Sequence, residues 1–118
     1  MHKCIIYIFI DILQPPQNQY ILEGTKATVN CEAYGQTAYW IINGTALTST
    51  HSIQLTRYEA MGITFTNASN QMTHNLTMTV PAYLEGAARN IICVARDASH
   101  RKIESSPVNI FVLQTLCK

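Results

Sequence analysis

Two cysteines and the only tryptophan constrain this chain more than any other feature. Cys31 precedes Trp40 by nine positions, and Cys93 follows far downstream. A chain of 118 residues is long enough for one hydrophobic core and too short for two domains. The fold must therefore place two thiols and one indole around a single core.

Beyond residue 10, the sequence pattern indicates short strands separated by turns. Apolar and polar residues alternate in KATVNCEA, and further alternating stretches are SIQL, GITFT, NLTMTV, NIICVA and VNIFVL. AYWII is followed by Asn43-Gly44, a typical hairpin turn. Proline and glycine recur too often for helices of ordinary length. The pattern predicts an all-β antiparallel sandwich or barrel.

A two-sheet sandwich explains the spacing of the thiols and the indole. A cysteine on each sheet can bridge the core, and a tryptophan on a neighbouring strand packs against the sulfurs. Cys31, Cys93 and Trp40 suit these roles, and closing so long a loop contributes roughly 4 kcal/mol in the chain-entropy model. Strand alternation then turns five further residues inward: Val29, Ala38, Ile42, Ile91 and Ala95.

In order and spacing, these segments resemble the immunoglobulin superfamily over residues 11–114. ILQPPQNQYILEGTKATVNCEA looks like the first strands of an intermediate-set domain, with a proline kink between two short strands. WIING resembles the tryptophan strand, HNLTMTV strand E, IICVA the second-cysteine strand F, and SSPVNIFVL strand G. The resemblance implies an immunoglobulin-like antiparallel sandwich with Greek-key topology. The family usually has a tyrosine two residues before the second cysteine, and this chain has Ile91 there. Both an intermediate-set and a variable-like subtype remain open.

The chain ends carry the other two cysteines. Residues 1–10 combine a basic start with a short apolar run, which is typical of a truncated secretion signal or of an apolar leader strand. Cys4 lies in this segment, and Cys117 lies in residues 115–118, a linker or chain end. Four cysteines allow three pairings, and only Cys31 with Cys93 has a structural argument. We expect cleavage to remove Cys4, and Cys117 to lie in a linker or form an interchain bond, with a Cys4 to Cys117 bridge as the alternative.

Three N-glycosylation sequons, at Asn43, Asn67 and Asn75, indicate a secreted protein or the ectodomain of a membrane protein. The net charge is +1 without a basic stripe, so nucleic acid is not an expected partner. The apolar N-terminal run is too short to span a membrane.

No pattern in the sequence is typical of an enzyme, a cofactor site or a metal site. The four histidines are scattered and belong to no ligand motif. Asp97 and His100, in RDASHRK, are the only candidates for an acid-base pair, and a loop of mixed charges is more often a solvated turn. We therefore expect neither catalysis nor a bound cofactor or metal.

Function is expected to lie on the outer face of the strands at 38–42, 91–95 and 108–113, the C, F and G strands of the immunoglobulin scheme. The predicted outward residues are large and apolar: Tyr39, Ile41, Ile92, Val94, Phe111 and Leu113. Together these six side chains would expose an apolar patch of roughly several hundred Å², which usually marks an interaction site. The expected partner is a second copy of this chain or another cell-surface protein. The loop from Asp97 to Lys102 would set specificity at its rim.

Two other interpretations stay open. Loops of this chain, or a bulge in strand G, could cover or invert the patch. The domain could instead be a structural spacer in the stalk of a multi-domain receptor, since tandem domains are expected in the full-length protein.

Overall fold

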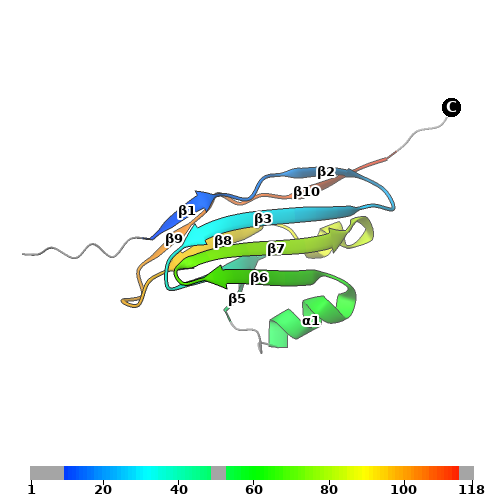
Figure 1. Ribbon diagram of the computed structural model, residues 1–118. Helices are drawn as coiled ribbons and strands as arrows, with labels where there is room; N and C mark the ends of the chain where they lie inside the picture. Colours follow the sequence, from blue (N-terminus) through cyan, green and yellow to red (C-terminus); the bar gives the residue numbers. More distant parts are fainter. Residues whose placement is uncertain (1–9, 49–52, 115–118) are drawn as a thin grey trace, which may run out of the picture.

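The computed structural model describes residues 10–48 and 53–114 and has the predicted two-layer β architecture (Figure 1). The leader at 1–9, the end at 115–118 and with them Cys4 and Cys117 lie outside the described residues. One sheet contains β1 (Asp11–Gln14), β3 (Lys26–Tyr34), β7 (Thr73–Pro81) and β6 (Thr64–Asn70), in that order. The facing sheet contains β5 (Thr45–Leu47), β4 (Thr37–Ile42), β8 (Ile92–Arg96) and β9 (Lys102–Glu104). All pairs within these two sheets are antiparallel.

A parallel pair completes the sandwich. β2 (Gln19–Leu22) runs beside β10 (Ile110–Leu113), while β1 pairs with β3 on the other sheet. The Pro15-Pro16 step between them interrupts the strand because proline donates no ladder hydrogen bond, and Pro16 is buried there. The predicted proline kink is therefore the point at which the first strand changes sheets.

Alternation places the core where the sequence predicted it. Cys31 and Cys93 are joined by a disulfide between the two sheets, with 6.4 Å between their Cα atoms. Trp40 lies directly opposite Cys93 in the β4–β8 register and is 4% exposed. Of the residues expected to point inward, Ala38 is half-buried and four are buried: Val29, Ile42, Ile91 and Ala95.

The β4–β5 hairpin confirms the turn predicted at Asn43-Gly44. Both residues have positive φ, 52° and 80°. Two successive positive-φ residues match the right-handed twist of the flanking strands, which is why Asn-Gly is favoured at this position.

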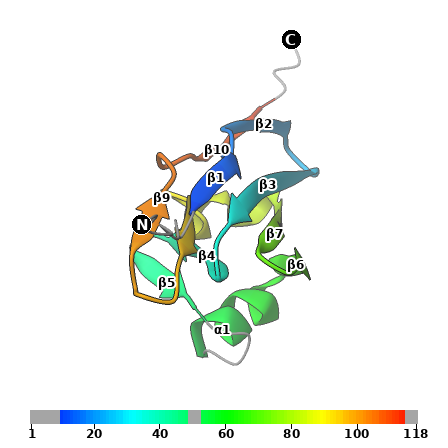
Figure 2. The same cartoon turned by 60° about the vertical axis from the view of Figure 1, so that its left-hand side comes forward.

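The prediction of a strand at SIQL is wrong for residues 53–55, which lie in a helix, and Ser52 lies outside the described residues. Residues Ile53–Met61 form helix α1, and a short 3-10 helix, η1, spans Ala82–Ala87. α1 contacts both β5 and β6, and it lies across the edge of the sandwich between them (Figure 2). Leu55 and Tyr58, one turn apart, pack against the core, but no residue of the helix is fully buried. Four residues of SIQL were too few to distinguish a strand from the start of this helix.

The helix also bears on the subtype. β5 takes the position of a C′ strand, and α1 follows where a variable-type domain would add a C″ strand. Within residues 10–48 and 53–114, the arrangement has one C′ strand and no C″ strand. This arrangement favours the intermediate-set interpretation.

Candidate protein-binding face

The six residues predicted to form an apolar face fall into two groups. Tyr39, Ile41 and Ile92 lie together on β4 and β8, with Ile41 opposite Ile92, and all three are half-buried. Phe111 and Leu113 lie on β10, where they are 43% and 48% exposed. The bulge that would have turned these two side chains inward is therefore not present in β10.

Val94 does not belong to an exposed face, which corrects the prediction. It is 0% exposed, although it is not part of the cluster that fills the space between the sheets. Val94 lies on the central strand β8, between Tyr39 of β4 and Glu104 of β9 in the register. A short side chain between two long ones on the same face is covered by its neighbours. Strand alternation correctly predicted that Val94 points away from the space between the sheets. It did not predict that neighbouring side chains cover Val94.

Phe111 and Leu113 have partners that the sequence analysis missed. In the parallel register Phe111 lies opposite Tyr20, and Leu113 lies opposite Leu22. Tyr20 is 64% exposed and Leu22 52%, while the intervening Ile21 packs against the core. We call Tyr20, Leu22, Phe111 and Leu113 the apolar strip. The alternation of polar and apolar residues in QYIL could have indicated a strand here. A stretch of four residues does not show which side chains face the core or which strand it pairs with.

Two hydrogen bonds of Asn109 anchor the start of β10. The Oδ1 of Asn109 accepts a hydrogen bond from the backbone of Asn90, at 2.9 Å. The backbone N–H of Asn109 donates to the Oδ1 of Asn18, at 2.8 Å. These bonds fix β10 relative to the beginnings of β8 and β2, so the strip has a defined position.

The loop between β8 and β9 is organised by Asp97, which is 3% exposed. Its carboxylate accepts hydrogen bonds from the backbone and hydroxyl of Ser99 and from the backbone and guanidinium of Arg101, all between 2.9 and 3.0 Å. Desolvation of the buried carboxylate raises its pKa, but these hydrogen bonds and the charge of Arg101 outweigh that effect, so the pKa of Asp97 lies below its usual value.

In the same loop, the side chains of Asp97 and His100 have different partners. The ring of His100 contacts Arg96, while the carboxylate of Asp97 is occupied by Ser99 and Arg101. The loop is also shorter than predicted, because β9 begins at Lys102. In the described part of the chain, no three histidine, cysteine or acidic residues cluster in a way that could hold a metal ion.

The three sequon asparagines are exposed and occupy different environments. Asn75 lies on the outer face of β7, opposite Glu32 and Ala68. Asn43 lies in the β4–β5 turn, where its side-chain amide donates to the carbonyl of Ala87 at 3.3 Å. Asn67 lies on β6, the last strand of its sheet. None of the helices that the structure describes is both long and apolar enough to cross a membrane.

Comparison with known proteins agrees with this geometry. No protein-family model matches the sequence, and no curated protein matches it in sequence. Among solved structures, the first domain of Duf (Kirre) is 17% identical with a TM-score of 0.62, over 92% of this chain and 100% of that one. The titin M10–obscurin-like 1 immunoglobulin complex gives 17% identity and a TM-score of 0.58, over 92% and 97% of the two chains.

A third solved structure contains two immunoglobulin domains. The Ig1-2 module of the Drosophila receptor protein tyrosine phosphatase DLAR is 21% identical with a TM-score of 0.58, over 90% of this chain. This chain spans half of that module, 50% of its length. At such identities the likeness shows the fold. The chain is an immunoglobulin-like domain, with the antiparallel two-sheet sandwich that its cysteines and tryptophan predicted.

Proposed function

We propose that this chain is an extracellular protein-binding module that acts in cell adhesion or cell-surface recognition, with no catalytic role. The apolar strip on β2 and β10 is the observation that carries the proposal. Its four large side chains are all more than two-fifths exposed, and they stand in two neighbouring rows. Neighbouring exposed apolar side chains of this kind usually mark a binding surface, because water contact with them is unfavourable.

The strip has the composition of an interface centre. Aromatic residues are enriched at binding hot spots, where they lose their contact with water. Tyr39, Ile41 and Ile92 would flank it as partly buried contacts, and the loop at 97–101 would lie at the rim. The outer face of β3 and β7 is polar, with Thr77 donating to Asn30 at 2.9 Å and Asn75 nearby, so we assign that face to solvent.

Two further observations support a protein partner and an extracellular location. The immunoglobulin domain of titin M10 is solved in complex with obscurin-like 1, and DLAR is a receptor, so domains of this fold do bind proteins and occur in receptors. The Cys31–Cys93 disulfide is typical of oxidising compartments, and the three sequons agree with secretion.

Sedimentation velocity on the glycosylated, oxidised chain tests the proposal over a wide range of concentrations. Phe111→Asp should remove self-association, or binding to a partner found by screening cell-surface proteins. The thermal midpoint should fall by only about 4–8 °C, because the stacking on Tyr20 is lost, and the domain should stay folded at the assay temperature. Thr28→Asp, an exposed change on the polar face, is the matched control and should leave association intact. Unchanged association in Phe111→Asp, or equal loss in both variants, would contradict the proposal.

A structural spacer is the second candidate, and one observation favours it. Leu22 and Leu113 are the last pair of the β2–β10 ladder, at the end of the sandwich where the described chain leaves it (Figure 1). A neighbouring domain in a tandem array would cover this end. Leu113→Asp would then disturb the packing of two domains, whereas Ile41→Asp, on β4 and outside the β2–β10 ladder, would have less effect. Loss of partner binding in Ile41→Asp would instead favour recognition through the whole face.

A further inference from the structure

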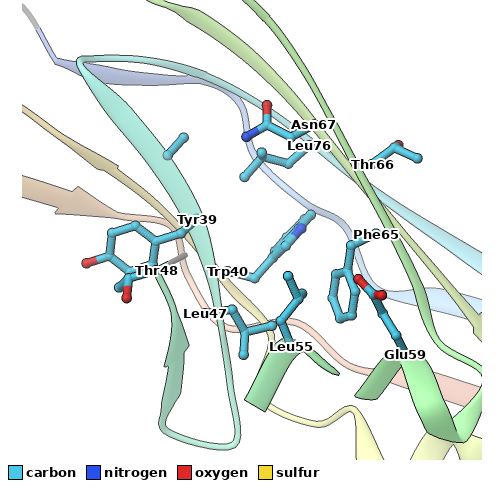
Figure 3. A pocket seen from close by; sticks show the side chains of 11 residues that line it. Tyr39, Trp40, Leu47, Thr48, Leu55, Glu59, Phe65, Thr66, Asn67 and Leu76 are labelled. Carbon is cyan, nitrogen blue, oxygen red and sulfur yellow. The ribbon is translucent and has the colours of Figure 1, made fainter. Parts of the chain in front are cut away.

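A cavity of about 290 Å³ opens at the edge of the sandwich between β4 and β6 (Figure 3). Trp40, Leu47 and Leu76 form its buried apolar floor, and the half-buried Leu55 and Phe65 close its sides. The remaining lining includes polar groups near the opening: Tyr39, Thr48, Glu59, Thr66 and Asn67. An apolar cavity with a few polar groups at its rim is the usual form of a small ligand site.

Asn67 lines this cavity because of its position in the β6–β7 register. It lies opposite Leu76, and Phe65 lies opposite Met78. Leu76 and Met78 are both core residues, so Phe65 and Asn67 also project toward the space between the sheets. β6 is the outermost strand of its sheet, and in residues 10–48 and 53–114 no further strand pairs with its free edge.

The nitrogen of the Asn67 side chain is available. Its Oδ1 accepts a hydrogen bond from the hydroxyl of Ser69 at 3.0 Å, and none of the residues in 10–48 or 53–114 accepts a bond from its Nδ2. Figure 3 shows the Asn67 side chain above the Trp40 ring, close to Leu76. Asn67-Ala68-Ser69 is a glycosylation sequon, so the nitrogen that would carry a sugar stands at the mouth of the cavity.

We propose that the cavity binds the first N-acetylglucosamine of a glycan attached to Asn67. The inference rests on the extracellular location in the proposed function. Attachment forms a bond between Nδ2 and the sugar C1, while the C1–O bond to the diphosphate of a lipid-linked oligosaccharide donor breaks. Nδ2 loses one proton, and the lipid diphosphate leaves.

The lining suits one sugar ring. The C–H bonds of one face of the ring would pack against the aromatic rings of Phe65 and Trp40, as other apolar groups do. The hydroxyl and acetamide groups would remain near Thr48 and Glu59, which can accept hydrogen bonds. A cavity of about 290 Å³ is at the small end for ligand sites, so the rest of the glycan would extend into solvent.

Neither of the other sequons offers such a site. Asn75 faces away from the core, and the Nδ2 of Asn43 already donates to the carbonyl of Ala87. Asn75 is on β7, the strand next to Asn67, but it occupies the opposite face of the sheet and has a strand on either side. Asn75→Gln is therefore the matched control for Asn67→Gln.

The test uses the full chain secreted from animal cells, with occupancy of each sequon measured by mass spectrometry. Asn67→Gln should lower the thermal midpoint by about 4 °C, and Asn75→Gln should leave it nearly unchanged. Enzymatic trimming to a single N-acetylglucosamine should preserve the stabilisation. Nuclear Overhauser contacts should connect that sugar to the rings of Phe65 and Trp40. In unglycosylated bacterial protein, Asn67→Gln should have no effect.

Several results would overturn the inference. A sugar on Asn67 without contacts to Phe65 or Trp40 would show that the cavity does not bind it. An equal loss of stability in unglycosylated protein would assign the effect to the asparagine itself. Occupied Asn75 with empty Asn67 would remove this site and leave the proposed function intact. If all three sequons were empty, the inference would fail, and the extracellular location would rest on the Cys31–Cys93 disulfide alone.

Discussion

Tyr20 and Phe111 stack across the parallel β2–β10 pair, with their ring centroids 5.1 Å apart and 16° between their planes. Both rings stay exposed, so they contact each other and solvent rather than the core. We expect a double-mutant cycle with Tyr20→Ala and Phe111→Ala to give a coupling free energy of roughly 0.5–1.5 kcal/mol in urea unfolding. Purely additive effects would show that the contact between the two rings does not stabilise the β2–β10 pair.

Two residues on the same face of β8, Ile92 and Val94, should respond differently to the same charge. Val94 is fully buried and Ile92 only half-buried. Val94→Asp places an unpaired carboxylate where water cannot reach it, and it should destabilise the domain by roughly 3 kcal/mol or more. Ile92→Asp should cost distinctly less, because part of the new side chain can reach water. Equal losses in urea unfolding would mean that both sites are equally enclosed.

The sequence predicted the positions whose environment follows from strand alternation alone. The faces of Cys31, Trp40 and Cys93 determined the burial of Val29, Ile42, Ile91 and Ala95. Each of these lies on a strand with one face toward the opposite sheet, so a period of two residues determines its side.

Other features depend on contacts that no local pattern records. Val94 is buried by side chains of two neighbouring strands, and the partnership of Tyr20 with Phe111 joins segments far apart in the chain. The helix that contains Leu55 has only a narrow apolar face, so its pattern was weak. The cavity beside Asn67 exists because an edge strand stands opposite this helix, which is a property of the tertiary fold.

The disulfide should contribute a large share of the stability. Cys31 and Cys93 are separated by 62 positions, and a crosslink over such a loop restricts the unfolded chain strongly. Replacing both with alanine should lower the free energy of unfolding by roughly 4 kcal/mol. The measurement is best made with Cys4 and Cys117 changed to serine, so that no other thiol can exchange. A double variant as stable as the oxidised parent, or a parent unaffected by reduction, would contradict this role.

The Asp97 network should make the stability of the domain depend on acidic pH. Because the pKa of Asp97 is lowered in the folded state, its carboxylate stabilises the fold above the unfolded pKa of about 3.9. This contribution is lost as the pH falls through the folded pKa. Asp97→Asn should therefore be less stable than the parent at pH 7, and the difference should shrink toward pH 2 in urea unfolding.

Arg101→Gln supplies the control for the cause of this shift. It removes the guanidinium bond and its charge but keeps the backbone bond from residue 101 to the carboxylate. The folded pKa of Asp97, followed by NMR of its side-chain carboxyl carbon, should rise in this variant. A stability difference between Asp97→Asn and the parent that is the same at pH 7 and pH 2 would show that the loop depends on the shape of the side chain and not on its charge.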